Sequence, residues 1–199
     1  MPFPDEVRPV EVVAYRPAWP AEFAALAAGL LASPLAARGA VDHIGSTAVP
    51  GLAAKDVIDV QVRLPHLDED RIAVVLGRAG FRRRSEPWNC VEETRTGPVR
   101  KLVFAPPAGA RAVNVHVRRD GTCGARDALL FRDYLRHDPR ERDAWGALKR
   151  ALAAGDGALA AYGRAKQPGW RGLMARADTW AAATGWRARP LGPWGKMGA

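Results

Sequence analysis

A glycine-serine turn, followed by an apolar strand with one acid in it, constrains the fold of this chain more than any other feature of the sequence. Residues 43–62 read His-Ile-Gly-Ser-Thr-Ala-Val-Pro-Gly-Leu-Ala-Ala-Lys-Asp-Val-Ile-Asp-Val-Gln-Val. Gly45 lets the backbone approach a phosphate closely, and Ser46 adds a hydroxyl and an amide at the same turn. Asp59 interrupts a run of Val and Ile, where a carboxylate is costly unless something binds it. The pattern predicts a strand that presents a site for a triphosphate and its metal.

The alternation of side chains along this strand separates two faces. Asp59 and Gln61 share one face, and Ile58 and Val60 share the other. Magnesium takes oxygen ligands, usually one or two carboxylates with phosphate oxygens and water. Asp59 is therefore the predicted metal ligand, and Gln61 is a neutral side chain in the neighbouring ligand position. Lys55 precedes the strand and is placed to contact a phosphate.

These residues resemble the signature of the GrpB family, also called UPF0157, which is placed in the nucleotidyltransferase superfamily with polymerase β-like enzymes. The resemblance covers about residues 8–182 and includes further matching segments at 15–19, 114–117, 130–136, 147–150 and 162–166. It implies an α/β (α+β) fold, with a nucleotidyltransferase-like mixed sheet flanked by helices. It also implies binding of a nucleoside triphosphate with magnesium, and transfer of a nucleotidyl group to a small-molecule acceptor.

The chain departs from the acidic pattern of that superfamily. There, the strand after the turn carries two acids and another strand supplies a third, whereas this chain has Asp59 and Gln61 as the first pair. If the segment at 113–117 is the third-acid strand, it offers Asn114 and His116 and no acid. Three interpretations follow: a one-metal transferase in which Gln61 and His116 support Asp59, a site for a softer metal through His116, and a nucleotide-binding protein without turnover.

Further side chains are candidates for the site, each with a structural alternative. His43 and Thr47 flank the turn as candidate substrate contacts, although a histidine at a strand end is often a hydrogen-bonded structural residue. His116 is a catalytic candidate that faces either the cleft or water. Lys101 is a candidate to neutralise phosphate charge, or a surface residue. Arg132 either reaches the cleft to bind substrate or joins its helix to the sheet.

The order of apolar patterns along the chain predicts a mixed fold. We expect strands at 10–15 and 40–44, a helix at 19–32, a helix capped by Asp68 and ended by Gly80, and three β-rich runs between 81 and 117. A helical portion follows at about 124–182, with Pro168 at the start or kink of its last helix and with Lys149 and Lys166 on solvated helix faces. We expect one domain over residues 1–182 and a flexible Gly- and Pro-rich tail at 183–199.

Composition limits the kinds of partner and the cellular setting that we expect for this chain. The net charge is +9 and 25 of the 30 basic residues are arginine, which suits an anionic partner. Nucleic acid is less favoured as a partner than a nucleotide, because no basic stripe alternates with aromatic residues. Cys90 and Cys123 show neither metal-ligand nor disulfide spacing, which favours a reduced, cytoplasmic setting. The apolar stretch at 21–37 is interrupted by Glu22 and Pro34, so we expect no membrane association.

The alternative to a transferase is a noncatalytic module that binds a nucleotide, a coenzyme or RNA. The resemblance includes family members fused to dephospho-coenzyme A kinase, which makes a coenzyme-related ligand worth testing. The chain itself lacks the Gly-x-x-x-x-Gly-Lys-Ser/Thr phosphate loop that such a kinase requires.

Overall fold

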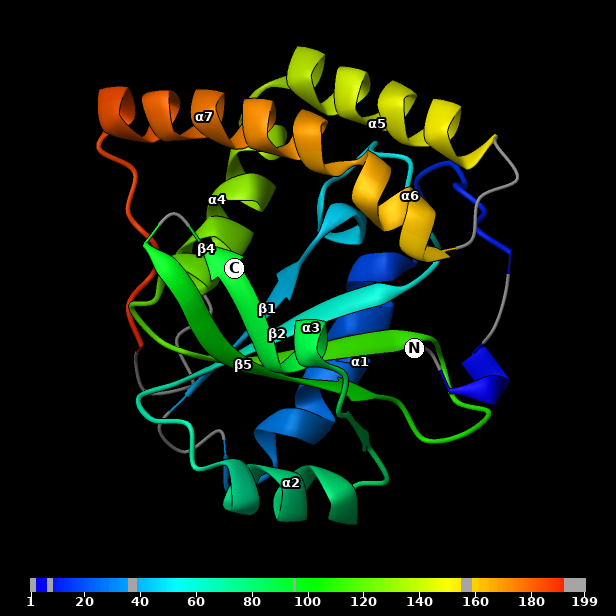
Figure 1. Ribbon diagram of the computed structural model, residues 1–199, viewed down its shortest axis with the longest axis vertical. Coiled ribbons are helices and arrows are strands. Elements are labelled where there is room, and N and C mark those ends of the chain that lie inside the picture. Colours follow the sequence, from blue (N-terminus) through cyan, green and yellow to red (C-terminus); the bar gives the residue numbers. More distant parts are fainter. Residues whose placement is uncertain (1–2, 7–8, 36–38, 95, 155–158, 192–199) are drawn as a thin grey trace.

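A mixed sheet stands at the centre of the structure (Figure 1). The computed structural model describes residues 3–6, 9–35, 39–94, 96–154 and 159–191. In this part the strand order is β1 (Ala40–Ile44), β2 (Ile58–Leu64), β6 (Val113–Arg119), β5 (Gly97–Ala105) and β3 (Arg82–Arg84), and β4 (Val91–Thr94) pairs with β5 off this path. β2 and β6 run parallel, and the other pairs are antiparallel. The structure confirms the predicted α/β (α+β) class, with a mixed sheet flanked by helices.

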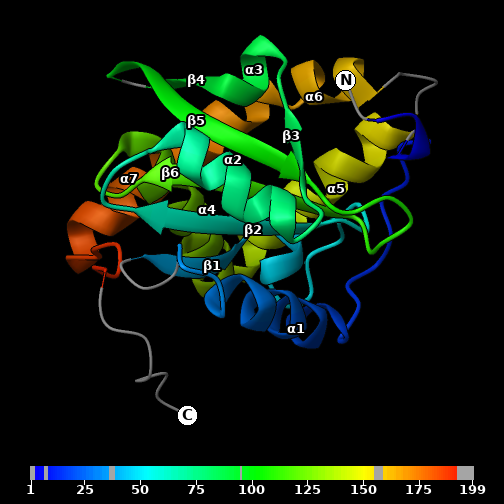
Figure 2. The ribbon, with the colours of Figure 1, turned by 90° about the horizontal axis from the view of Figure 1, so that it is seen from below.

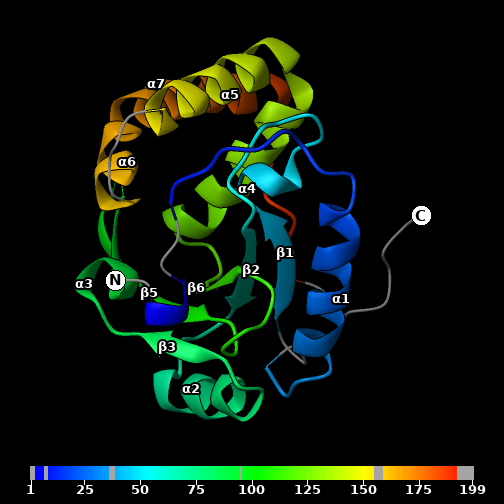
Figure 3. The same ribbon diagram turned by 90° about the vertical axis from the view of Figure 1, so that its right-hand side faces the viewer.

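The alternation of β2 separates an apolar face from a polar face, as the sequence predicts. Ile58, Val60 and Val62 are at most 3% exposed and belong to one core with residues of α1 (Trp19–Leu31) and α2 (Glu69–Arg78). Asp59 and Gln61 point to the other face, on which α4 (Cys123–His137) lies. Figure 3 shows α1 and α4 on opposite sides of β1 and β2. The polar face is thus enclosed between the sheet and the C-terminal helices.

The C-terminal helices pack around a second core. They are α4, α5 (Pro139–Ala153), α6 (Leu159–Ala165) and α7 (Gln167–Thr184). Figures 1 and 3 show α5, α6 and α7 together at one end of the molecule, and Figure 2 views the molecule from the opposite end. Leu173, Ala177 and Ala181 recur every four residues on α7, are at most 2% exposed and pack with Leu130 of α4. This spacing places them on one helix face. The structure confirms the predicted C-terminal helical portion.

Local signals set several helix ends. Asp68 accepts a hydrogen bond from the backbone N–H of Arg71 at 3.1 Å and so caps α2. Gly80 follows α2 with a φ of 81°, a conformation that suits glycine. Pro168 lies in the first turn of α7, so it begins this helix.

Two predictions about strands need correction. The segment 10–15 is not a strand; it forms one antiparallel bridge, between Val13 and Ala54. β1 and β6 already occupy both edges of β2, so this segment has no place beside that strand. The first of the three β-rich runs after residue 80 is divided by a short helix, α3 (Pro87–Cys90), so that it yields β3 and β4. The proline at the start of α3 interrupts the run.

The part of the tail that the structure describes contacts the domain. Trp186 donates its indole N–H to Asp133 at 3.1 Å, and the carbonyl of Arg189 accepts from Arg63 at 2.8 Å. The remainder of the predicted flexible tail, residues 192–199, lies outside the described residues. Within the described residues, we find no helix that is both long enough and apolar enough to cross a membrane.

Candidate functional site

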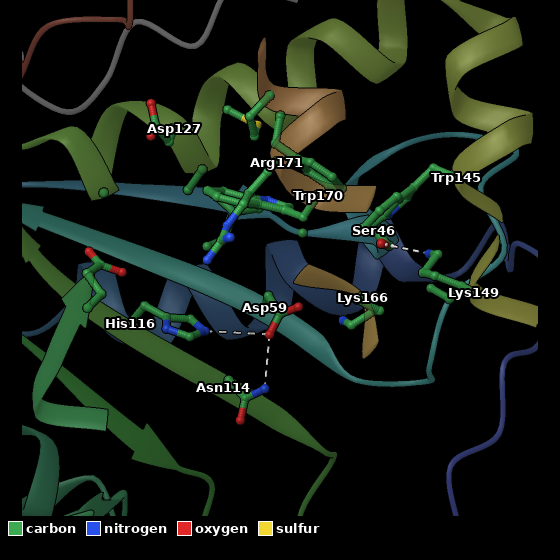
Figure 4. A pocket seen from close by; sticks show the side chains of 18 of the residues that line it. Ser46, Asp59, Asn114, His116, Asp127, Trp145, Lys149, Lys166, Trp170 and Arg171 are labelled. Carbon is green, nitrogen blue, oxygen red and sulfur yellow. Dashed lines mark hydrogen bonds and ion pairs between the residues drawn. The ribbon is translucent and has the colours of Figure 1, made fainter. Parts of the chain in front are cut away.

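A cavity of about 850 Å³ opens between the polar face of the sheet and the C-terminal helices. Its floor is formed by the turn after β1 and by polar residues of β2 and β6, and its walls come from β4, α4, α5, α6 and α7. Figure 4 shows that side chains from these separate elements point into the same space. The cavity volume falls within the range of small-molecule binding sites.

The Gly-Ser turn is pressed against Asp59. Gly45 has a φ of 70° and a ψ of −169°, a region that is almost restricted to glycine. A Cβ atom at this position would lie 2.5 Å from Oδ2 of Asp59. Ser46 then begins a short 3-10 helix at Ser46–Ala48. Both the backbone conformation and the close carboxylate therefore require glycine, and the turn and Asp59 form one unit.

Asp59 is held on one side by two residues of β6. Asn114 donates to Oδ1 of Asp59 at 3.0 Å, and Nε2 of His116 lies 3.6 Å from the same oxygen (Figure 4). The parallel register of β2 and β6 places Asn114 directly opposite Asp59. Burial opposes the charged form of Asp59, but His116, Asn114 and the positive Lys55 prevail and hold the pKa of this carboxyl below its usual value. Asp59 is thus an ionised carboxylate, and its side chain is 30% exposed.

Three lysines converge on the other side of the cavity. Lys149 is 3% exposed and donates to Oγ of Ser46 at 2.8 Å and to the carbonyl of Ala53. Lys55 and Lys166 lie 5.8 Å and 4.8 Å from the ring centroid of Tyr162. None of the three forms an ion pair within the part of the chain that the structure describes. The cavity therefore contains a group of buried or half-buried ammonium groups for which the described residues supply no direct counter-ion.

Burial alters the protonation of these lysines. It lowers the pKa of Lys149 from 10.5 to about 7, and the nearby positive charge of Lys166 adds to this effect. Burial likewise lowers the pKa of Lys55 and of Lys166. The prediction that Lys149 lies on a solvated helix face is wrong, because α5 turns this side chain toward the Gly-Ser turn.

Gln61 and Lys101 do not line the cavity. Gln61 is fully buried, donates to the carbonyl of Ala125 at 3.1 Å and accepts from Arg118 at 2.9 Å. Both ends of its amide are thereby satisfied, so the interpretation of Gln61 as support for a metal is wrong. The ammonium group of Lys101 lies 3.5 Å from the carboxylate of Glu92, and of these two residues only Glu92 lines the cavity. The lysine is committed to an ion pair of the sheet.

His43 and Arg132 support the turn from behind. His43 is 7% exposed, stacks on Phe23 with ring centroids 4.5 Å apart, and lies 3.0 Å from Oγ1 of Thr47. Burial lowers the pKa of His43 to about 4, so its ring is neutral. Arg132 donates to the carbonyl of His43 at 3.1 Å and pairs with Asp133 at 2.7 Å. Thr47 does line the cavity, whereas His43 and Arg132 occupy structural positions outside it.

Aromatic side chains complete the lining and were missed in the sequence. Trp145 and Trp170 line the cavity beside the Gly-Ser turn and α7, and Arg171 points toward the same space (Figure 4). Trp145 is 6% exposed, and its indole N–H has no hydrogen-bond partner among the described residues. One sequence signal was available, because Trp145 precedes Lys149 by four positions and Tyr162 precedes Lys166 by four. This spacing places an aromatic ring and a lysine on the same helix face.

The residues around Asp59 do not fit a pair of magnesium ions. Gln61 is turned away, and β6 supplies an amide and an imidazole where a third acid is expected. No group of three or more His, Cys, Asp or Glu side chains in the described ranges could hold a metal ion. Oδ2 of Asp59 accepts no hydrogen bond from these residues, so one ion that arrives with phosphate oxygens fits the site.

The chain is similar in sequence to known proteins. A dephospho-CoA kinase from Mycolicibacterium paratuberculosis is 36% identical over 197 residues, which cover 90% of this chain and 48% of that protein. A UPF0157 protein from Pseudomonas aeruginosa is 35% identical over 147 residues, or 72% of this chain and 57% of that protein. The chain spans about half the length of the curated relatives it matches.

A solved structure and a family model give the assignment. The crystal structure of the conserved protein GrpB from Enterococcus faecalis has a TM-score of 0.69 and 29% identity, and the match covers 85% of this chain and 99% of that one. The family model described as GrpB protein matches residues 9–176, which is most of the chain. The chain therefore belongs to the GrpB family, as its sequence signature indicates.

Proposed function

We propose that this protein binds a nucleoside triphosphate in the cavity, with the phosphates against Ser46 and the three lysines. The observation that carries the proposal is the convergence of Lys55, Lys149 and Lys166 without an ion pair among the described residues. Unpaired charges in a partly buried site are costly, and an anionic ligand relieves that cost. Charge-assisted hydrogen bonds from ammonium groups to phosphate oxygens are about twice as strong as neutral ones.

The aromatic lining supports a nucleotide over a simple inorganic anion. Trp170, Phe131 and Met174 provide an apolar wall against which a base or sugar packs. Trp145 adds an indole N–H that has no partner among the described residues, and Arg171 adds a further positive charge. Binding sites for cofactors commonly combine such an apolar wall with a few polar groups that fix the orientation of the ligand.

Nucleotidyl transfer to a small molecule is the second candidate function. The specific observation in its favour is the ionised Asp59, which directly faces the Gly-Ser turn. Asp59 would hold one divalent ion together with phosphate oxygens, and this ion would neutralise charge on the transferred phosphoryl group. Ser46 would fix the phosphates, and Lys55, Lys149 and Lys166 would oppose the charge that develops during transfer. The part of the cavity toward β4 and α7 leaves room for the acceptor.

Binding is tested by calorimetry with each nucleoside triphosphate, with magnesium and with a chelator. Lys166→Met and Lys55→Met should each weaken binding about 10- to 100-fold, the effect of removing one charged hydrogen bond of about 1.5–3 kcal/mol. Arg71→Met is the matched control, because Arg71 is exposed on α2 at the opposite end of the molecule from α5 (Figure 1). If no triphosphate binds, or if the control loses as much affinity as the lysine variants, the proposal fails.

Turnover is tested separately with Asp59→Asn. A transferase should lose turnover in this variant and keep triphosphate binding through the lysines. If neither protein releases pyrophosphate with any acceptor, the noncatalytic module is favoured. Dephospho-coenzyme A is included among the ligands, because the mycobacterial relative carries the name of a kinase for that compound. RNA is included too, and binding that weakens steeply with salt would support it.

A further inference from the structure

Ser46 and Lys149 are joined by a hydrogen bond at the floor of the cavity (Figure 4). Nζ of Lys149 lies 2.8 Å from Oγ of Ser46, although the two residues are 103 positions apart in the sequence. Ser46 is partly exposed and lines the cavity, whereas Lys149 is 3% exposed. A hydroxyl that a ligand can reach is thus paired with a buried amine.

The backbone carbonyl of Ala53 fixes the orientation of this amine. It accepts a second hydrogen bond from Nζ of Lys149. A neutral amine has two N–H groups and one lone pair, so donation to Ala53 leaves the lone pair free to accept the O–H of Ser46. A nucleophile and a base about 2.6–3.2 Å apart, with the base oriented by a third group, form the arrangement of an activated nucleophile. Serine and lysine are one of its known pairs.

The surroundings of Lys149 make its amine a weak enough base to act at neutral pH. Burial has the largest effect on its pKa, and the positive charge of Lys166 adds to it. Asp59 opposes this shift, whereas Arg150 and Lys55 increase it, and the resulting pKa is about 7. About half of the Lys149 side chains are therefore unprotonated at pH 7. A base of this strength suits proton transfer at neutral pH, which an ordinary lysine does not.

We propose that Ser46 is a nucleophile toward the acyl group of a small uncharged ester, with Lys149 as its general base. Oγ of Ser46 bonds to the carbonyl carbon, and its proton passes to Nζ of Lys149. The bond from this carbon to the leaving oxygen then breaks, and Lys149 gives the proton to the leaving alcohol. Water attacks the acyl-serine and gives a proton to Lys149, which returns it to Oγ of Ser46 as the carboxylic acid leaves.

The cavity supplies the other features that this reaction requires. Lys55 and Lys166 face it without an ion pair among the described residues, and their positive charge stabilises the negative oxygen of the tetrahedral intermediate. Phe131 and Trp145 line the same cavity with ring centroids 5.9 Å apart, and they offer an apolar surface to the acyl group. Trp145 shares a helix face with Lys149, because four positions separate them.

The reaction goes beyond the proposed function and competes with it. A triphosphate against Ser46 covers the nucleophile, and its negative charge raises the pKa of Lys149 and so removes the base. An uncharged ester leaves Lys149 able to accept a proton. The ester therefore reacts only in a cavity that holds no triphosphate.

Diisopropyl fluorophosphate tests the nucleophile, because attack by Oγ of Ser46 forms a P–O bond, releases fluoride and transfers the proton to Lys149. Peptide mass spectrometry locates the adduct and measures its rate of formation. We expect an adduct on Ser46 whose rate rises about tenfold per pH unit below about pH 7 and is constant above it. p-Nitrophenyl acetate tests turnover, and we expect release of p-nitrophenolate with the same pH dependence.

Variants separate a base from a residue that only supplies charge or structure. Ser46→Ala should remove the adduct, and Ser85→Ala, at an exposed position outside the cavity, should retain it. Lys149→Met and Lys149→Arg should each slow the reaction of Ser46 at least about 100-fold, the usual contribution of a general base. Arginine keeps the positive charge but cannot accept a proton. Circular dichroism checks that each variant is folded, and the pH profile of the wild type tests the base even where a variant does not fold.

Three results would overturn the inference. They are the absence of either the adduct or p-nitrophenolate release in the wild type, a rate that does not change between about pH 6 and pH 8, and a folded Lys149→Arg protein that reacts as fast as the wild type.

Failure of this inference and failure of the proposed function give different results. Triphosphate binding in calorimetry by a protein that forms no adduct rejects the nucleophile and leaves the proposed function intact. An adduct on Ser46 in a protein that binds no triphosphate rejects the proposed function and retains the nucleophile. Where both hold, saturating ATP should prevent adduct formation, and an unchanged rate would contradict the placement of the phosphates against Ser46.

Discussion

Replacement of Lys149 by methionine should make the unliganded protein more stable at neutral pH and should weaken its binding of triphosphate. Lys149 is 3% exposed, and its partners are two neutral oxygens, Oγ of Ser46 and the carbonyl of Ala53. Methionine has a similar length and fills the same space without a charge. A substitution that stabilises the fold and impairs binding identifies a position retained for function and not for stability.

The magnitude follows from the pKa of Lys149. Its ordinary pKa of 10.5 falls to about 7 in the folded protein, which at about 1.36 kcal/mol per pH unit corresponds to at most about 5 kcal/mol of destabilisation. The variant loses two hydrogen bonds and leaves the carbonyl of Ala53 unpaired, which costs about 1–3 kcal/mol. We therefore expect Lys149→Met to raise the free energy of unfolding at pH 7 by at most about 2–4 kcal/mol, the difference between these two effects.

The sign of the pH dependence gives an independent check. Between pH 7 and pH 10.5 the unfolded chain keeps the Lys149 proton that the folded chain has lost. The free energy of unfolding of the wild type therefore rises with pH in this window, and below it the full destabilisation is present. The advantage of Lys149→Met should shrink by at most about 1.4 kcal/mol per pH unit as pH rises from 7.

Urea denaturation of both proteins at pH 7 and pH 9.5 measures these differences. Arg71→Met is the control, because Arg71 is exposed on α2 at the other end of the molecule, so its replacement should change stability by less than about 0.5 kcal/mol. The reasoning is refuted if Lys149→Met is less stable than the wild type by the same amount at both pH values. That result would mean that the charge of Lys149 is well compensated in the folded protein.

Three further predictions concern the turn, the sheet and proton uptake. Gly45→Ala should lower the free energy of unfolding by at least about 2 kcal/mol more than Gly109→Ala does, because both glycines have a positive φ but only Gly45 faces Asp59. Equal losses of the two variants in urea denaturation would contradict the close contact between Gly45 and Asp59. Gln61→Leu should lower the free energy of unfolding by about 2–4 kcal/mol, because it leaves buried hydrogen-bond partners unsatisfied. The same variant should change the dissociation constant for triphosphate by less than about twofold, and a larger change would indicate that Gln61 contacts the ligand. Triphosphate binding at pH 8 should take up a proton at Lys149, since phosphate raises the pKa that burial lowers. Calorimetry in buffers of different ionisation enthalpy measures this uptake, and its absence in the wild type would contradict the proposed contact.

The alternation of β2 shows what a sequence pattern can and cannot predict. The pattern places Asp59 and Gln61 on the same polar face, and the structure confirms that face. It does not reveal that the start of α4 covers one of these positions and not the other. Gln61 meets the carbonyl of Ala125 and the side chain of Arg118, whereas Asp59 lies beside the open cavity. The two-residue period of a strand fixes the direction in which a side chain points. The residues that the side chain then contacts come from segments more than fifty residues away, so the period does not predict them.

The lysines show the same limit of prediction from sequence, here for residues that are expected at the surface. Lysine is almost always exposed, so solvated helix faces were the expected positions of Lys149 and Lys166. An aromatic residue four positions before each of them, Trp145 and Tyr162, indicates a face that packs against the protein. The spacing alone cannot show whether an acid meets each lysine, because that depends on elements distant in sequence.

Within the part of the chain that the structure describes, no acid pairs directly with these three lysines, and their proposed role depends on this. A domain is stable by only about 5–15 kcal/mol, so a buried ammonium group without an acid is a large fraction of the total. The described residues place Lys149 in that situation, and Lys55 and Lys166 face the same cavity. A ligand that brings several negative charges offsets this cost, whereas a neutral or cationic ligand adds to it. The group of unpaired lysines therefore constrains the ligand of this cavity more strongly than the incomplete acidic pattern around Asp59 does.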